Sequence, residues 1–398
     1  MPINSKFEIC VVTSTRAEYG LLRNLIFKLR EDSNVQMTLV VTGCHLSDKF
    51  GNTQTEILKD GIHDYVRIPI PMEDDSKKGM AICAGTALTK FAEFFSNQCF
   101  DMVILLGDRF EILSVATAAH LIGIPIAHIS GGDITEGAVD DAVRHSITKM
   151  STLHFPGCEQ SRKRIIQMGE QPEYVFNVGE PGVENCLNLE KLSLKELSKN
   201  LNFDILNNDY SIVTFHPVTM ENNTGVKQVY ELIHAMDSLD GMYYIITMAN
   251  ADAGGRAIND IWIEEGKKHK NWLVVSSLGV VRYLSAMKYA KMVIGNSSSG
   301  IVEAPSMKVP TINIGDRQKG RMLAESVISC KPLEEDIYNA FKTALSPQVE
   351  EKISNVESPF GDGTTSKKIL DYIIKYLNNK NEFNEKHFYD IDFSYLGE

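Results

Sequence analysis

Short apolar segments alternate with amphipathic segments along nearly the whole chain. EICVVTS (8–14) and DMVILLGD (101–108) are rich in Val, Ile and Leu, as is typical of buried β-strands. The stretch 17–32 instead places five apolar residues on one face of a helix: Leu21, Leu22, Leu25, Ile26 and Leu29. Further strands are predicted at 37–43, 124–130, 152–157, 174–179, 210–217, 242–250, 271–277, 291–297, 310–316 and 326–330. This alternation predicts an α/β fold with parallel sheets covered by helices.

A polar stretch divides this pattern into two halves. Residues 187–209 are rich in Asn, Lys and Glu, and the alternation of strands and helices restarts after them. We therefore expect two doubly wound, Rossmann-like domains, at 1–186 and 187–378, followed by a charged and aromatic tail at 379–398. Because ligands of such sheets bind beyond the carboxyl ends of the strands, we expect the ligand in a cleft between the domains.

Composition narrows the class of protein. The chain has 43% hydrophobic and 23% charged residues, which is typical of a soluble globular protein. Its net charge of −12 argues against nucleic acid as a partner. Seven scattered cysteines without a C-x-x-C pair favour reduced thiols in a cytoplasmic protein. No apolar run reaches the length of a signal peptide or membrane span, so we expect no membrane association.

Charged residues follow two strands of the first half. VVTSTRAEYG places Arg16 at the start of a helix without a phosphate-binding glycine loop, so Arg16 either contacts a diphosphate or forms a surface ion pair. VILLGDRFE places Asp108 and Arg109 directly after a buried strand, which favours a functional position over a structural turn.

The densest group of carboxylates follows a Gly-Gly turn. In HISGGDITEGAVDDAVRH, four acidic residues precede or begin a helix: Asp133, Glu136, Asp140 and Asp141. On that helix, Asp140 and Arg144 are four residues apart, as are Asp141 and His145, so each pair shares a face. Acidic residues also stabilise a first helical turn, but that role does not account for the whole group. Paired carboxylates near a cleft transfer protons in catalysis. The segment has no H-x-x-x-H pair, so we expect no metal site.

Polar residues also end the strands of the second half. His216 and Asn250 follow two strands, and Arg317 follows another within a cationic segment, DRQKGR. In GNSSSGIVEAP, Ser297 and Ser298 begin a predicted helix, where they either cap it or help to bind an anion. Glu303 would repel a phosphate, so we expect it to accept hydrogen bonds from a diol such as a ribose. Together these features predict a nucleotide site.

The motifs TSTRAEYG, LLGDRFE, DDAVRHSITKMSTLHF, FHPVT, NADAG, GNSSSGIVEAPS and INIGDRQKGR resemble those of one family, in order, from about residue 8 to residue 375. The family is the hydrolysing UDP-N-acetylglucosamine 2-epimerases of sialic-acid biosynthesis. The resemblance implies the GT-B arrangement of two Rossmann-like domains, no cofactor, and a homodimer or homotetramer. It also implies conversion of UDP-N-acetylglucosamine and water into UDP and N-acetylmannosamine, through elimination to 2-acetamidoglucal and hydration.

The resemblance assigns roles to matching positions. It implies that Asp108, Asp140 and His216 are catalytic, with His216 contacting the diphosphate. It implies that the remaining matching residues bind the UDP-sugar: Arg16, Arg109, Asn250, Ser297, Ser298, Glu303 and Arg317. Some relatives carry Glu where this chain has Ser130, and since serine is no carboxylate base, Asp133 is the next candidate for that work.

Other activities remain open at this point. Some family members act on UDP-2,4-diacetamido-2,4,6-trideoxyglucose in the legionaminic acid pathway, and the sequence does not fix the substituents at C4 and C6. A GT-B glycosyltransferase or a non-catalytic nucleotide-sugar sensor would explain the nucleotide site alone. Neither would need the carboxylates after Gly131 and Gly132.

Overall fold

The computed structural model describes residues 6–74, 76–135, 139–217, 224–249, 255–354, 357–379 and 386–392. Within these ranges the chain forms two compact units. The first comprises 6–134, 139–181 and 364–392, and the second comprises residue 135 and 182–363. Each unit has its own sheet and its own hydrophobic cores.

The described part of the first unit contains a six-stranded parallel sheet with the order β3-β2-β1-β4-β5-β6. The strands are β1 (Phe7–Thr13), β2 (Val35–Thr42), β3 (Tyr65–Ile68), β4 (Met102–Leu106), β5 (Ile126–Ile129) and β6 (Leu153–Phe155). This is the doubly wound Rossmann order, in which the direction of winding changes between β1 and β4. The carboxyl ends of these two strands are therefore the expected ligand position of this unit.

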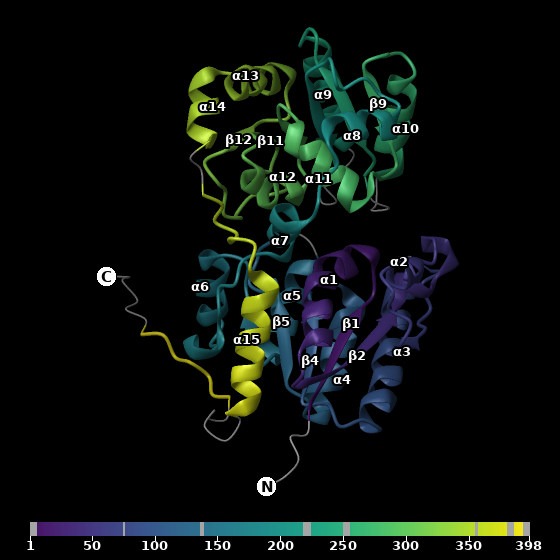
Figure 1. Ribbon diagram of the computed structural model, residues 1–398, viewed down its shortest axis with the longest axis vertical. Helices are drawn as coiled ribbons and strands as arrows, with labels where there is room; N and C mark the ends of the chain where they lie inside the picture. Colours follow the sequence, from purple (N-terminus) through teal and green to yellow (C-terminus); the bar gives the residue numbers. More distant parts are fainter. Residues whose placement is uncertain are drawn as a thin grey trace. The chain divides into compact units, whose positions relative to one another are not determined.

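Helices cover both faces of the first sheet (Figure 1). Alternation along β1 explains why: Ile9 and Val11 join a core with α1 and α15, while Cys10 and Val12 join a core with α3, α4 and α5. The helices of this unit are α1 (Arg16–Glu31), η1 (Gly43–Leu46), η2 (Asp48–Phe50), α2 (Gln54–Lys59), α3 (Lys77–Ser96), α4 (Phe110–Ile122), α5 (Val139–Met150), α6 (Glu159–Gln167), η3 (Pro172–Tyr174) and α15 (Thr365–Asn378).

The second unit repeats this order of winding. Its described sheet is β12-β11-β10-β7-β8-β9, again six parallel strands, with the change of direction between β7 and β10. The strands are β7 (Tyr210–Thr214), β8 (Tyr243–Thr247), β9 (Trp272–Val275), β10 (Val293–Gly295), β11 (Thr311–Ile314) and β12 (Val327–Cys330).

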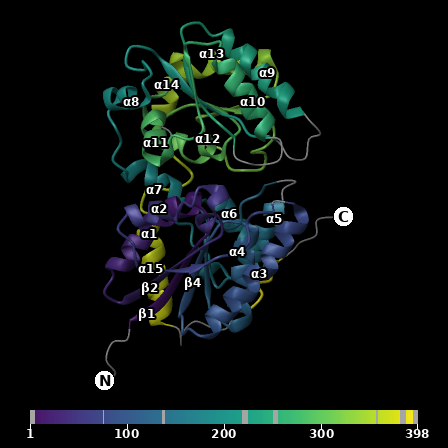
Figure 2. The same ribbon diagram turned by 90° about the vertical axis from the view of Figure 1, so that its right-hand side faces the viewer.

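The second sheet is also covered on both faces (Figure 2). Val213 of β7 packs with one buried cluster and its neighbour Ile212 packs with another. The helices are α7 (Pro181–Asn188), which begins at the boundary of the units, α8 (Leu194–Leu201), α9 (Thr224–Asp237), α10 (Gly255–Gly266), α11 (Gly279–Tyr289), α12 (Ser298–Val302), η4 (Ala304–Met307), α13 (Glu334–Ala344) and α14 (Pro347–Ser354).

The last helix belongs to the first unit, although the sequence predicted it within a domain at 187–378. Ile369, Ile373 and Leu377 of α15 are buried in the same core as Leu22 and Leu25 of α1. Both ribbon views show α15 beside α1 (Figures 1 and 2). The hydrophobic face of α15 is therefore buried in the core of the first unit.

Two strand predictions differ from the structure. Residues 174–179 form no strand: Val175 makes a single bridge to His154, and the 3₁₀ turn η3 immediately precedes it. In contrast, β3 at the sheet edge had no predicted counterpart, because YVRI is short and interrupted by an exposed Arg67. Among the described helices, none is long and apolar enough to cross a membrane.

Candidate active site

Polar residues collect at the switch point of the first sheet. Ser14 and Thr15 directly follow β1, and Asp108 and Arg109 follow β4, which pairs with β1. Thr15 caps α1 through a capping box with Glu18, whose carboxylate accepts from the backbone N–H groups of Ser14 and Thr15. This turn brings a helix-capping carboxylate to the carboxyl edge of the sheet.

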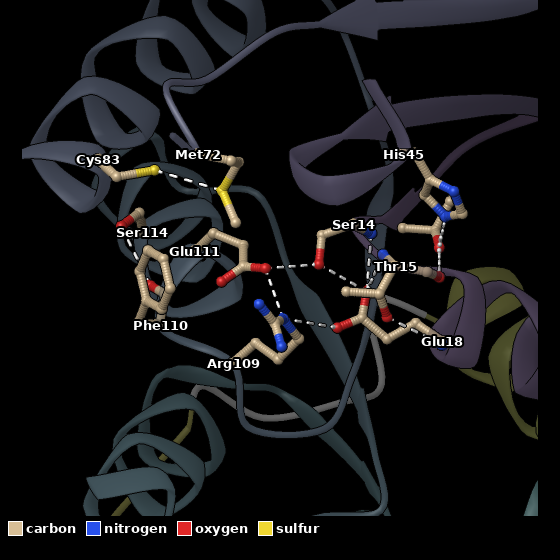
Figure 3. Close-up of polar contacts among 11 residues, drawn as sticks. Ser14, Thr15, Glu18, His45, Met72, Cys83, Arg109, Phe110, Glu111 and Ser114 are labelled. Atoms are coloured by element: carbon tan, nitrogen blue, oxygen red, sulfur yellow. Dashed lines mark hydrogen bonds and ion pairs between the residues drawn. The ribbon is translucent and has the colours of Figure 1, made fainter. Parts of the chain in front are cut away.

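A second carboxylate lies beside it, forming what we call the Glu18–Glu111 cluster: Ser14, Glu18, Arg109 and Glu111. The Ser14 hydroxyl is 2.9 Å from Glu18 Oε2 and 2.8 Å from Glu111 Oε1. Arg109 Nε donates to Glu111 Oε1 at 2.5 Å and lies 3.8 Å from Glu18 Oε1. Figure 3 shows Ser14 and Arg109 between the two carboxylates. The predicted ligand Arg109 is thus held by two acidic side chains.

Burial and the charge of Glu111 raise the pKa of Glu18 to about 7. Glu18 Oε1 and Glu111 Oε2 are buried without a hydrogen-bond partner among the described residues. Two carboxylates with one nearby guanidinium are unfavourable to ionise together, so this cluster retains a proton into the neutral range. Neither glutamate was among the predicted site residues. The T-x-x-E capping pattern and the GDRFE motif were the signals available in the sequence.

Asp108 is bound by a buried arginine of α5. Arg144 donates from Nη2 to Asp108 Oδ2 and from Nη1 to the main-chain oxygen of Asp133 at 2.9 Å. Its Nη1 also lies 3.7 Å from Asp141 Oδ1. Arg144 therefore joins the end of β4, the Gly-Gly turn and α5, a connecting role that the sequence did not predict.

Of the other predicted acidic residues, Asp133 and Asp141 contact this arginine, whereas Glu136 lies outside the described residues. The Asp133 carboxylate accepts from Ser161 Oγ at 2.8 Å, and Asp140 lies exposed in the first turn of α5. The predicted pair on α5 is present, with His145 Nε2 3.5 Å from Asp141 Oδ2. Asp108 thus accepts from Arg144 and Asp133 from Ser161, and Asp140 belongs to the first turn of α5.

Arg16 occupies the first residue of α1 and is half exposed. Its Nη1 lies 3.9 Å from Glu56 Oε1, the surface ion pair that the sequence left as an alternative. Exposed pairs of this kind contribute about 0–1 kcal/mol, so the contact does not prevent Arg16 from binding an anion.

The switch point of the second sheet is built around Asn296. This buried residue follows β10 and exchanges hydrogen bonds with the His216 backbone beyond β7, at 2.7 Å and 2.8 Å. Its own main-chain oxygen accepts from Arg317 Nη1 at 2.9 Å and from Gln318 Nε2 at 2.8 Å. Asn296 thereby brings together two predicted site residues, His216 and Arg317, although it was not itself predicted.

His216 is buried, and burial together with the Arg317 charge lowers its pKa to about 4. Its Nδ1 is buried without a hydrogen-bond partner among the described residues. A neutral imidazole with an unsatisfied ring nitrogen is suited to hydrogen bonding with a ligand rather than to charge neutralisation.

The serine run lies at the same switch point. Gly295 has φ 132°, and a Cβ there would fall 1.9 Å from the Thr214 carbonyl oxygen, so this turn requires glycine. Ser297 caps α12, which is five residues long, while Ser298 is exposed. Glu303 accepts from Ser299 Oγ at the end of that helix. Burial raises the pKa of Glu303 to about 7, and the Ser299 hydrogen bond partly opposes this.

Asn250, a predicted ligand, lies outside the described residues. Within the described ranges, no group of three or more His, Cys, Asp or Glu side chains is arranged to hold a metal ion. The candidate residues within the described ranges thus form one group beyond the strand ends of each unit.

Comparison with known proteins gives consistent matches over the chain. A family model described as UDP-N-acetylglucosamine 2-epimerase matches residues 27–374. The GDP/UDP-N,N'-diacetylbacillosamine 2-epimerase (hydrolyzing) of Campylobacter jejuni is 39% identical over 376 residues, covering 94% of this chain and 97% of that protein. Polysialic acid biosynthesis protein P7 of Escherichia coli is 39% identical over 389 residues, covering 96% and 97% respectively.

The fold matches a solved structure of similar length. The UDP-GlcNAc 2-epimerase from Neisseria meningitidis, solved bound to UDP-GlcNAc, superimposes with a TM-score of 0.80 at 18% identity. The match covers 93% of this chain and 100% of that chain. Together with the two strand orders, it confirms the predicted fold of two Rossmann-like domains of the GT-B type.

Proposed function

Since the chain belongs to the hydrolysing UDP-N-acetylglucosamine 2-epimerase family, we propose that it hydrolyses a UDP-linked 2-acetamido sugar with inversion at C2. The observation that carries this proposal is 39% identity with a hydrolysing 2-epimerase across 94% of the chain. The carboxylates gathered at the first switch point support it, because a glycosyltransferase or a sensor does not need them.

The chemistry explains which groups are required. In the first step a carboxylate takes the C2 proton, the C–H electron pair forms the C1=C2 bond, and UDP leaves with the C1–O electrons. In the second step a proton adds to C2 from the opposite face, and water adds to C1 and loses a proton. Because the C2 proton is only weakly acidic, stabilising the departing diphosphate is important, and one preorganised donor is worth about 3 kcal/mol.

The two units take different parts in this scheme. In the first, Asp108 and Asp140 are the candidates for proton transfer, with Asp133 as a further candidate; the position of Asp108 and Asp133 beyond the carboxyl ends of β4 and β5 supports this. Arg16 and Arg109 of the same unit bind the nucleotide sugar.

In the second unit His216 and Arg317 bind the diphosphate, together with Ser297 and Ser298, and Glu303 binds the ribose. The shared contacts of His216 and Arg317 with Asn296 support a common site for them.

For the sugar itself, we propose N,N'-diacetylbacillosamine, which is 2,4-diacetamido-2,4,6-trideoxyglucose. Its support is the activity for which the Campylobacter relative is named. N-acetylglucosamine is the second candidate, with N-acetylmannosamine as product, and it is favoured by the equal identity to the polysialic acid protein. Both sugars feed the synthesis of sialic-type acids.

The test is a panel of donors under identical conditions: UDP-N,N'-diacetylbacillosamine, GDP-N,N'-diacetylbacillosamine and UDP-N-acetylglucosamine. Released nucleotide and free sugar are followed by NMR. We expect UDP and the C2 epimer from the diacetamido donor, with kcat/KM at least about ten-fold above that for UDP-N-acetylglucosamine, a difference of about 1.4 kcal/mol. A higher kcat/KM for UDP-N-acetylglucosamine would select the second candidate, and release of no nucleotide from any donor would refute the epimerase.

A further inference from the structure

Ser130 adopts an unusual backbone conformation at the functional edge of the first sheet. It directly follows β5, its N–H donates to the Phe155 carbonyl of β6 at 3.0 Å, and its φ is 59°. Left-handed φ values are uncommon for residues other than glycine, and such strain is concentrated at functional sites. Serine nevertheless supplies no carboxylate here, where some family members carry glutamate.

The structure brings a carboxylate to this serine from a distant part of the chain. Ser130 Oγ donates to Glu180 Oε2 at 2.7 Å, across 50 residues of sequence. The other oxygen, Glu180 Oε1, lies over Gly157, where an added Cβ would fall 1.9 Å from it. A side chain at position 157 would displace the carboxylate, so Gly157 provides the space that Glu180 occupies.

The backbone beneath Glu180 is fixed. The buried Thr365 hydroxyl at the start of α15 lies 3.2 Å from the Val178 carbonyl and 3.4 Å from the Glu180 carbonyl. The Val178 N–H donates to the Pro156 carbonyl at 3.2 Å. Glu180 is therefore held at its main chain by Thr365 and at one carboxylate oxygen by Ser130, as expected of a preorganised group.

Glu180 also belongs to the same region as Asp133. Glu180 lies over Gly157, and the next residue, Cys158, has its Sγ 3.3 Å from Ser161 Oγ, which donates to Asp133 Oδ1 at 2.8 Å. The main-chain oxygen of Asp133 and the carboxylate of Asp108 both accept from Arg144. Three acidic residues are thus arranged beyond the ends of β4, β5 and β6.

We propose that Glu180, oriented by Ser130, is the catalytic carboxylate that takes up the C2 proton of the sugar. This assignment rests on the proposed function. The C–H bond breaks, its electron pair forms the C1=C2 bond as UDP departs, and the proton moves to Glu180. Inversion at C2 needs a second group that protonates C2 from the opposite face of the sugar. Asp108 or Asp140 takes this role. Glu180 replaces, from another segment, the carboxylate that position 130 lacks.

The test compares variants that keep or lose the carboxylate. Glu180→Gln keeps the shape and accepts the Ser130 hydrogen bond but takes up no proton, so kcat should fall by about 10²- to 10⁴-fold. Ser130→Ala removes one hydrogen bond to a charged group and should lower kcat by only about ten-fold. Glu180→Asp keeps a carboxylate and should retain more activity than Glu180→Gln. UDP affinity, measured by calorimetry, should stay within about two-fold of wild type for all three, because none contacts UDP in this proposal.

Glu173→Gln is the matched control, since Glu173 is an exposed residue of η3. It should turn over at the wild-type rate. Glu180→Gln turning over within ten-fold of wild type would overturn the assignment, as would equal losses in Glu180→Gln and Glu180→Asp. A wild-type protein that releases no nucleotide would instead refute the proposed function itself.

Discussion

At the scale of single residues, the pKa values of three carboxylates, Glu18, Glu303 and Glu170, are shifted in two directions. Burial raises the pKa of Glu18 and that of Glu303 to about 7. Burial would also raise the pKa of Glu170, but hydrogen bonds from His154 and two lysines outweigh it and lower that pKa to about 2. The carboxylates with raised pKa values lie at the two switch points, whereas Glu170 lies where α6 ends. Neutral-range protonation is therefore concentrated at the candidate site.

Glu18 also has a consequence for stability. Its pKa is about 7 in the folded protein, against 4.5 for a freely exposed glutamate, so the folded state binds more protons between these values. Stability contributed by this group is therefore greatest below about pH 4.5 and decreases as the pH rises towards 7. The raised pKa of Glu18, at the carboxyl edge of the first sheet, therefore lowers the stability of the folded protein at neutral pH.

Glu303 offers a test of the ribose contact. Because its pKa is about 7, ionisation increases between pH 6 and pH 8, and an ionised carboxylate accepts hydrogen bonds from a diol more strongly. We expect the ratio of the UDP dissociation constants, Glu303→Gln over wild type, to increase by up to about ten-fold between pH 6 and pH 8. Calorimetric titration of both proteins at each pH measures it, and the ratio cancels the ionisation of UDP itself. A ratio that stays constant from pH 6 to pH 8 would rule out the proposed contact.

At the scale of elements, the segment 386–392 fixes the far end of α5. Lys386 Nζ donates to the carbonyls of Lys149 and Ser151, each at 2.7 Å, and lies 2.7 Å from Glu170 Oε2. A cation there complements the negative end of the helix dipole. Phe388 packs against Gly169, whose carbonyl accepts from the Tyr389 N–H at 2.9 Å. The tail thereby stabilises the helix whose first turns carry Asp140 and Arg144.

This arrangement predicts a pH-dependent stability. The pKa of Glu170 is about 2 in the folded protein, against 4.5 for a freely exposed glutamate, so its contribution is complete above pH 4.5 and is lost as the pH falls towards 2. Glu170→Gln should lower the free energy of unfolding at pH 7 by about 3 kcal/mol, since it breaks a buried ion pair. Denaturant melts at pH 7 and pH 3 should show a smaller difference between variant and wild type at pH 3.

Glu159→Gln is the control, because its pair with Arg162 is half exposed and is worth about 0–1 kcal/mol. A difference for Glu170→Gln that is as large at pH 3 as at pH 7 would contradict the linkage.

Local patterns predicted most elements but not their partners. The 3.6-residue period of α1 correctly predicted the buried face with Leu22, Leu25 and Ile26, because that signal is contained within the helix. The run 174–179 is as apolar as a strand, yet it pairs only at Val175, since the backbone pairing of a segment depends on neighbours distant in sequence. The candidate site shows the same limit. Residues at strand ends, such as Asp108 and His216, were predictable, whereas Glu180 was not, because only the fold brings it to Ser130.

At the scale of the whole molecule, the two units have the same sheet topology. Each sheet has the doubly wound order, and each places its polar residues at the strands where the winding changes. The chain returns to the first unit with α15, so the first core contains residues from both ends of the described chain. The domain boundary at 378 placed α15 in the second half, because local sequence does not indicate which of two similar sheets a helix covers. The homodimer or homotetramer expected from the sequence stays a prediction.

The central claim is that this protein breaks the C2–H bond of a UDP-linked 2-acetamido sugar by elimination of UDP and then adds water across the C1=C2 bond. The most direct measurement is turnover in D₂O, with the configuration and the isotope at C2 of the released sugar followed by NMR. We predict UDP release with one solvent deuterium at C2 of the epimerised sugar, because the proton that is removed exchanges with solvent before C2 is protonated again. A released sugar that keeps its original proton and configuration at C2 would show simple hydrolysis of the glycosyl bond and would contradict the claim.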